Sequence, residues 1–246
     1  MSHHNPVIRP CELAPGSLKL LNDGTQFFMS IVMLVKERMK HPVITAKPEM
    51  PIMEVLNIMK REGIRRTPVV DSHGKMIGIV SDKDLLNAGP SDATSLSVWE
   101  INYLLSKIKV EDVMTKNVIS VHEDTPIEEA AYIMASNKIG GLPVTRDGGI
   151  VGIITETDLF KIMLEMMGAR EPGVRITALV PEQIGELAVV TQAIAKENGN
   201  IIALGFSGEE STHRVVTIKV EGLSEEKLRM LVTPLVVAVT DVRTCC

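Results

Sequence analysis

Apolar and polar positions follow the same pattern twice in the middle of the chain. Each copy opens with a short apolar stretch (residues 43–46 and 118–121), which predicts a strand, and continues with apolar residues at helical spacing. Two stretches without charged residues follow, separated by a glycine-containing turn, and predict a pair of buried strands in each copy. We expect these strands at residues 67–70 and 76–80, and again at 142–145 and 150–154. A second helix should begin near Asp84 in one copy and near Asp158 in the other.

The two copies also match residue by residue, at an offset of 75 positions and, after a one-residue gap, of 74. Such self-similarity indicates two domains of the same fold. We place the first domain at residues 33–94, an inter-domain segment at 95–108 and the second domain at 109–170. Pro51 and Pro126 are expected at the first position of their helices, and Thr125 with Glu128 should form a capping box.

A different pattern begins at residue 174. It predicts a strand at 174–180, a helix at 186–197, strands at 201–206 and 214–220, a helix capped by Ser224, and a last strand at 235–240. This order is that of a ferredoxin-like βαββαβ fold. The fold class is therefore α+β (mixed α/β), with an N-terminal extension at residues 1–32 and a third domain at 174–246.

Composition narrows the classes of function. Hydrophobic residues make up 45% of the chain and charged residues 23%, which is ordinary for a globular protein in water. The net charge of −5 gives no general electrostatic reason to bind nucleic acid, and no stretch approaches the roughly 18 apolar residues of a membrane-spanning helix. The three cysteines, Cys11, Cys245 and Cys246, lie near the chain ends, which fits a reducing compartment. We therefore expect a cytoplasmic protein with neither nucleic acid nor membrane among its partners.

The residues best suited to bind a ligand form two matching pairs. Ser81 with Asp84, and Thr155 with Asp158, each place a hydroxyl at the end of a buried strand and a carboxylate at the start of a helix. Helix N-terminal amides and a hydroxyl attract phosphate, and a carboxylate accepts hydrogen bonds from ribose hydroxyls. A glycine on each strand, Gly78 or its counterpart in the second copy, would let a flat base approach the backbone. The same spacing also fits a plain capping box, worth about 0.5–2 kcal/mol, so both interpretations remain open.

The sequence contains no arrangement typical of a catalytic centre. There is no Gly-x-x-x-x-Gly-Lys-Ser/Thr phosphate-binding loop and no Gly-x-Ser-x-Gly elbow. His41, His73, His122 and His213 show no paired metal-ligand spacing. We expect a protein that is not an enzyme and that has neither catalytic residues nor a metal ion.

The repeat resembles a tandem pair of CBS domains, a Bateman module, over about residues 33–168. The resemblance implies a sensor that holds an adenosine nucleotide (AMP, ADP, ATP or S-adenosylmethionine) in clefts between the two domains, as a regulatory ligand and not as a cofactor. By the family pattern, Asp84 and Asp158 would hold ribose, while Ser81 and Thr155 would contact phosphate. The pattern also assigns a small polar residue after the first strand and residues lining the base pocket, which here are Thr45, Ser120, Thr67, Pro68, Leu142 and Pro143.

The two copies differ at one place in this expected site. Arg65 and Arg66 in the first copy correspond to Gly140 and Gly141 in the second. Arginine is a good phosphate partner, whereas glycine offers only backbone and space. The sequence therefore predicts two unequal nucleotide sites, with the alternative that the arginines form a solvated or ion-paired surface.

The C-terminal region resembles an ACT domain, a regulatory module that often binds amino acids at a dimer interface. The residues that correspond to the family pattern are Glu182, Ile184, Gly185, Leu187, Asn200 and Ile201. Glu182 and Ile184 stand where the usual pattern has Asp and Pro. The resemblance implies either amino-acid binding or a role in dimerisation alone.

A CBS pair followed by an ACT domain, together with the segment around Trp99 and Tyr103, resembles the AcuB-type proteins associated with acetoin utilisation. Our first hypothesis is a homodimeric regulatory protein that senses an adenosine nucleotide and acts on an unidentified partner protein. The alternative is a structural or interaction module in which the hydroxyl–carboxylate pairs only cap helices. An enzyme with an unrecognised site is the third hypothesis.

Overall fold

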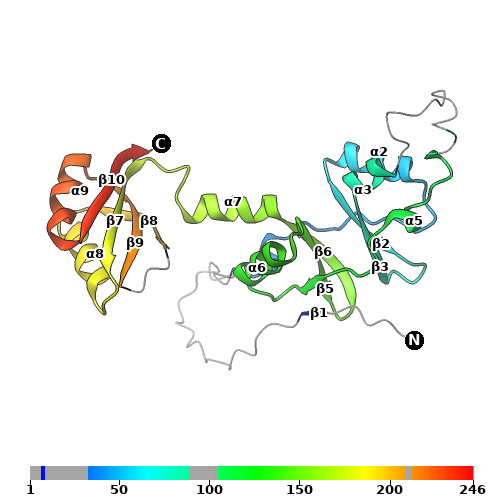
Figure 1. Ribbon diagram of the computed structural model, residues 1–246, viewed down its shortest axis with the longest axis horizontal. Coiled ribbons are helices and arrows are strands. Elements are labelled where there is room, and N and C mark those ends of the chain that lie inside the picture. The colour runs from blue at the N-terminus through cyan, green and yellow to red at the C-terminus, as the bar shows by residue number, and fades with distance from the viewer. Residues whose placement is uncertain (1–6, 9–32, 89–102, 104, 209–211, 246) are drawn as a thin grey trace, which may run out of the picture. The chain divides into compact units, whose positions relative to one another are not determined.

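A computed structural model describes residues 7–8, 33–88, 103, 105–208 and 212–245 (Figure 1). The chain divides into two compact units, residues 1–159 and 160–246, which are described separately below. Within the described part, no helix is both long enough and apolar enough to cross a membrane. The inter-domain segment at residues 95–108, which includes Trp99, falls largely outside the described residues.

The first repeat is built on a two-stranded antiparallel sheet. It contains α1 (Val35–Arg38), α2 (Ile52–Glu62), β2 (Arg66–Val70), β3 (Met76–Ser81) and α3 (Asp82–Asn87). The apolar face of α2 packs on the sheet, and its buried residues are Ile52, Val55, Leu56 and Met59. The strand expected at residues 43–46 is reduced to a single bridge between Ala46 and Val69, so that prediction was too long.

The second repeat has the same order with a larger sheet. Its elements are α5 (Val110–Val113), β4 (Ser120–His122), α6 (Ile127–Asn137), β5 (Gly141–Arg146), β6 (Gly149–Thr155) and α7 (Glu156–Met166). The strands are ordered β1-β4-β5-β6, and β1 (Val7–Ile8) pairs parallel with β4. The sequence pattern gave no sign of this short strand in the N-terminal extension.

Two predicted helix starts were wrong in detail. Pro51 and Pro126 are the N-cap residues of α2 and α6, one position before the first helical residue, and neither helix has a side-chain cap. Thr125 therefore lies outside α6, and its buried Oγ1 has no hydrogen-bond partner within the described part of the chain, so the expected capping box with Glu128 does not form. The later helices α3 and α7 begin two residues before Asp84 and Asp158.

The two repeats exchange their leading helices. Lys40, just after α1, exchanges two backbone hydrogen bonds with Ile153 of the second repeat, at 2.8 and 3.1 Å. Thr115, just after α5, makes the matching pair with Ile79 of the first repeat, at 2.9 and 3.0 Å. Each repeat therefore folds against a segment that precedes the other repeat, and the two form one unit.

A glycine in β3 and another in β6 make room for the exchanged segments. A β-carbon at Gly78 would overlap Sδ of Met114, and one at Gly152 would overlap Sδ of Met39. The space beside each glycine is thus filled by a methionine from an exchanged segment. The expectation that these glycines let a nucleotide base approach the strand was wrong.

The second unit confirms the predicted βαββαβ order. It comprises β7 (Gly173–Pro181), α8 (Glu186–Lys196), β8 (Asn200–Ser207), β9 (His213–Glu221), α9 (Glu225–Val232) and β10 (Ala238–Cys245). The antiparallel sheet runs β10-β7-β9-β8, and both helices pack their apolar residues on one of its faces. Ser224 caps α9 as expected, because its Oγ accepts a hydrogen bond from the backbone N–H of Lys227 at 3.3 Å. The last strand begins later than predicted, since residues 233–235 form a short 3₁₀ helix that contains Pro234.

Candidate functional site

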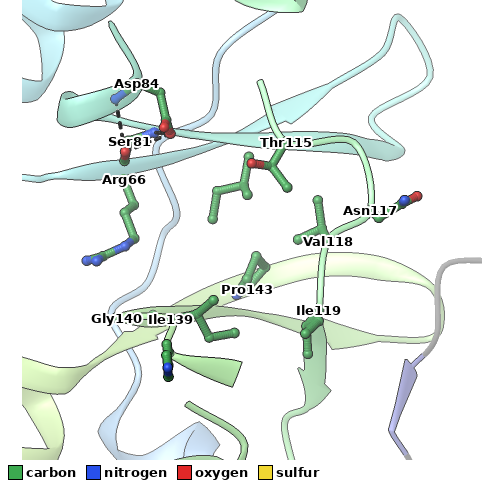
Figure 2. A pocket seen from close by; sticks show the side chains of 13 residues that line it. Arg66, Ser81, Asp84, Thr115, Asn117, Val118, Ile119, Ile139, Gly140 and Pro143 are labelled. Carbon is green, nitrogen blue, oxygen red and sulfur yellow. Dashed lines mark hydrogen bonds between the residues drawn. The ribbon is translucent and has the colours of Figure 1, made fainter. Parts of the chain in front are cut away.

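The first unit contains a cavity of about 330 Å³ between its two repeats (Figure 2). This is within the range of small-molecule pockets. The first repeat contributes β2, β3 and α3, and the second contributes the segment before β4, the turn between α6 and β5, and β5 itself. The lining residues are Arg66, Ile79, Ser81, Asp84, Thr115, Asn117, Val118, Ile119, Lys138, Ile139, Gly140, Gly141 and Pro143.

Ser81 and Asp84 form a capping box at the start of α3 and also line the cavity. Asp84 Oδ2 accepts hydrogen bonds from the Ser81 backbone N–H at 2.8 Å and from Ser81 Oγ at 2.7 Å, while Ser81 Oγ accepts one from the Asp84 backbone N–H at 3.2 Å. Asp84 Oδ1 makes no hydrogen bond with any other described residue. The two interpretations of this pair are therefore compatible, because one carboxylate oxygen serves the cap and the other remains available to a ligand.

The second pair repeats the local geometry in a different setting. Asp158 Oδ2 accepts hydrogen bonds from Thr155 Oγ1 at 2.6 Å and from the Thr155 backbone N–H at 3.0 Å. Asp158 is only 7% exposed, and neither residue of this pair lines the 330 Å³ cavity. The structure thus brings the first pair, and not the second, to this cavity.

Arg66 explains why the two copies differ. It lines the cavity and extends from β2 toward Gly140 on the other repeat, as Figure 2 shows. A β-carbon at Gly140 would overlap the Arg66 guanidinium, and one at Gly141 would lie 3.3 Å from Arg66 Cδ. The glycines leave the room that the arginine side chain occupies, so the equivalent positions of the two copies fit together.

The remaining predicted site residues are divided between the cavity wall and the interior. Gly141 and Pro143 line the cavity. Thr67, Ser120 and Leu142 are at most 1% exposed and do not line it, nor do Pro68 and Thr45. The hydroxyls of Thr67 and Ser120 are buried without a hydrogen-bond partner among the described residues.

Sequence reasoning missed more than half of the cavity wall. Thr115, Asn117 and Lys138 line it, together with Ile139 and Gly140. Lys138 has a left-handed backbone (φ 54°) at the end of α6. The repeat alignment included neighbouring positions, but no local signal says that the segment before β4 faces Ser81 of the other repeat.

The cavity combines an anion-binding side with an apolar side. Arg66 and Lys138 carry positive charge, and Asp84 supplies one carboxylate. Ile79, Val118 and Pro143 provide apolar surface. Such a wall can hold a flat apolar ring, accept hydrogen bonds from hydroxyls and neutralise an anionic group.

Of the six residues singled out in the second unit, Asn200 and Ile201 line a pocket of the described residues, and the other four do not line that pocket. Ile184 is fully exposed in the loop between β7 and α8, and Gly185 is the N-cap of α8 with φ 96°. Glu182 forms an ion pair with Arg214 at 2.5 Å, and Leu187 packs against the core. Asn200 and Ile201 line a shallow depression whose other residues are Ala188, Thr191, Gln192, Ala195 and Gly199.

Comparisons with known proteins agree on the first unit. The sequence model of the CBS domain family matches residues 35–91 and 110–165. The L-aspartate semialdehyde sulfurtransferase of Methanocaldococcus jannaschii is 35% identical over 136 residues, which are 54% of this chain but only 24% of that enzyme. The uncharacterized protein MJ1426 of the same organism is 31% identical over 156 residues, with 54% of this chain and 92% of that protein covered.

Among solved structures, the CBS domain pair of protein MJ0100 in complex with 5′-methylthioadenosine and S-adenosyl-L-methionine is similar to this chain. The two are 34% identical, with 54% of this chain and 96% of that chain covered and a TM-score of 0.45. The match to both repeats, and the near-complete coverage of MJ1426, show that the chain belongs to the family of CBS-domain proteins and carries a tandem CBS pair.

Proposed function

We propose that the CBS pair binds an adenosine nucleotide as a regulatory ligand in the cavity between its repeats. The observation that carries this proposal is that Asp84, with one carboxylate oxygen unused by the cap, and Arg66 line the same cavity. In the proposed complex, Asp84 Oδ1 accepts hydrogen bonds from the ribose hydroxyls and Ser81 contacts phosphate. The apolar wall formed by Ile79, Val118 and Pro143 takes the base.

The charges of the cavity favour a phosphorylated ligand. Arg66 and Lys138 both line it, and each attracts phosphate. S-adenosylmethionine carries a positive sulfonium centre in place of the phosphate, and that centre would meet the same two cations. We therefore expect AMP, ADP or ATP to bind more tightly than S-adenosylmethionine.

A second, weaker site is proposed at Thr155 and Asp158. Residues that do not line the cavity are proposed to pack behind the residues that contact the ligand: Thr45, Thr67, Pro68, Ser120 and Leu142. The two sites are unequal because Arg66 serves the first cavity, whereas its counterpart Gly141 brings no charge. The domain limits given above, residues 33–94 and 109–170, remain part of this proposal.

The second unit is proposed to be an ACT-like module that assembles two chains, or binds an amino acid, through the region of Glu182, Ile184, Gly185, Leu187, Asn200 and Ile201. Its βαββαβ order supports this proposal. The whole protein is proposed to act in the cytoplasm as a non-catalytic homodimeric regulator of another protein, related to the AcuB-type group. A structural module without a ligand is the competing proposal.

A thermal-shift panel with AMP, ADP, ATP and S-adenosylmethionine tests the proposed ligand. A ligand at about 100 times its Kd should add about 2.7 kcal/mol of stability. We expect an upward shift in Tm with a phosphorylated nucleotide, and loss of that shift in Asp84→Asn. Ser224→Ala is the matched control, because it removes a helix cap in the other unit and should lower Tm without changing the response to the ligand. No shift with any nucleotide would favour the structural module.

A further inference from the structure

Arg66 and a carboxylate from the start of α7 both lie beside Gly140. A β-carbon at Gly140 would overlap the Arg66 guanidinium and would also lie 2.8 Å from Oε2 of Glu156. The backbone N–H of Glu156 donates a hydrogen bond to the Gly140 carbonyl at 3.2 Å, which fixes the first residue of α7 beside that glycine. The guanidinium and the carboxylate therefore lie above the same residue of the cavity wall.

This carboxylate changes the charge of the cavity. The lining residues carry two cations, Arg66 and Lys138, and one anion, Asp84. Without Glu156 the site would be net positive, and with it the charges balance. A phosphate that approaches Arg66 therefore also approaches the Glu156 carboxylate, which lies near the guanidinium although no ion pair within 4.0 Å joins the two.

We propose that Glu156 is a positioning residue that lowers the affinity of the cavity for anionic ligands by competing for Arg66. The inference rests on the proposed nucleotide site and adds to it the residue that sets its charge selectivity. The Glu156 carboxylate weakens the binding of a phosphorylated nucleotide, because its charge repels the phosphate and attracts Arg66. The neutral nucleoside adenosine has no phosphate and is not affected in this way. Glu156 thus sets the difference in affinity between a nucleotide and its nucleoside.

Calorimetric titration of the full chain with AMP and with adenosine tests this role. Glu156→Gln should bind AMP about three- to fivefold more tightly than the wild type, the size of an interaction between exposed charges. The affinity for adenosine should stay within about twofold of the wild type. The matched control is Glu128→Gln, which removes an exposed carboxylate from the first turn of α6 and should leave both affinities unchanged.

A second pair of variants separates an effect through Arg66 from a general one. Arg66→Met should weaken AMP binding, and adding Glu156→Gln to Arg66→Met should change nothing further. The inference is overturned if Glu156→Gln leaves AMP affinity unchanged, if it acts equally on adenosine, if Glu128→Gln has the same effect, or if the effect persists without Arg66. A wild-type chain that binds neither AMP nor adenosine would instead overturn the proposed nucleotide site, and with it this inference.

Discussion

The two CBS repeats place the same pair of groups in different surroundings. In the first repeat, Asp84 lines a cavity and keeps one carboxylate oxygen outside the cap. In the second, Asp158 is 7% exposed and lines no part of that cavity, although it accepts the same two hydrogen bonds from the residue three positions before it. The same hydroxyl–carboxylate hydrogen bonds therefore form whether or not the pair lines this cavity. What distinguishes a candidate site is what surrounds the pair.

The comparison is tested most strongly at the arginine pair of the first repeat. Arg66 lines the cavity, whereas the neighbouring Arg65 does not. Replacing Arg66 by Met should weaken AMP binding roughly tenfold or more, because a hydrogen bond to a charged group contributes about 1.5–3 kcal/mol. Arg65→Met should change the affinity less than about twofold. Equal effects of the two variants in calorimetric titrations would indicate a general charge effect and not a site.

Gly78 and Gly152 test a feature that the two repeats share. Gly78→Ala and Gly152→Ala should each lower the free energy of unfolding by about 1–3 kcal/mol, since the added methyl group overlaps Met114 or Met39. Chemical denaturation measures both. The two costs should be similar, and Met114→Ala should relieve part of the cost of Gly78→Ala. If the glycines instead served a nucleotide base, the alanine variants would lose AMP affinity and keep their stability.

Thr67 and Leu142 occupy equivalent positions, and both are buried. Only the threonine carries a hydroxyl, which has no hydrogen-bond partner among the described residues. Thr67→Val should raise the free energy of unfolding by about 1 kcal/mol, because it removes an unpaired buried polar group at constant shape. A loss of AMP affinity in this variant, measured by titration, would show that the hydroxyl serves the ligand and contradict a purely structural cost.

Low pH should destabilise the second repeat more than the first. Hydrogen bonds from Arg146 hold the pKa of the buried Glu123 below its usual value of 4.5, and Lys36 does the same for Asp124 relative to 3.8. Since the unfolded chain takes up these protons first, the stabilisation is full above about pH 5 and is lost as the pH falls through the lowered values.

The first repeat has Pro48 and Glu49 at the equivalent positions, and Glu49 forms no ion pair with another residue that the structure describes. Glu123→Gln should therefore flatten the fall in Tm between about pH 5 and pH 3 by an amount worth about 1 kcal/mol or less. Glu49→Gln is the control and should leave the slope unchanged. Identical pH profiles for all three proteins would show that these ion pairs do not contribute.

The sequence pattern predicted those helices and strands whose buried residues recur at a regular local spacing. The paired strands of each repeat and the order of the second unit follow from runs of apolar residues, and they need no knowledge of distant contacts. The pattern failed where a proline sets the boundary, at Pro51 and Pro126, and where a stretch pairs through a single bridge, at Ala46. It also gave no sign of β1, because two residues carry no periodicity.

The sequence predicted fewer than half of the residues that line the candidate site. Ser81, Asp84 and Arg66 could be found because their chemistry is local to one repeat. Lys138 and Thr115 could not, because their place in the cavity depends on the exchange of segments between repeats. The exchange itself rests on backbone hydrogen bonds and on glycines that accept methionines, which no one-dimensional pattern records.

The central claim is that the cavity at Ser81 and Asp84 is the primary nucleotide site. A crystal structure of the full chain, grown with AMP near one molar equivalent, tests this most directly. We predict AMP in this cavity, with its ribose on Asp84 Oδ1 and its phosphate at Arg66, while the Thr155–Asp158 pair stays empty or less occupied. AMP bound at Thr155 and Asp158 with the first cavity empty would contradict the account.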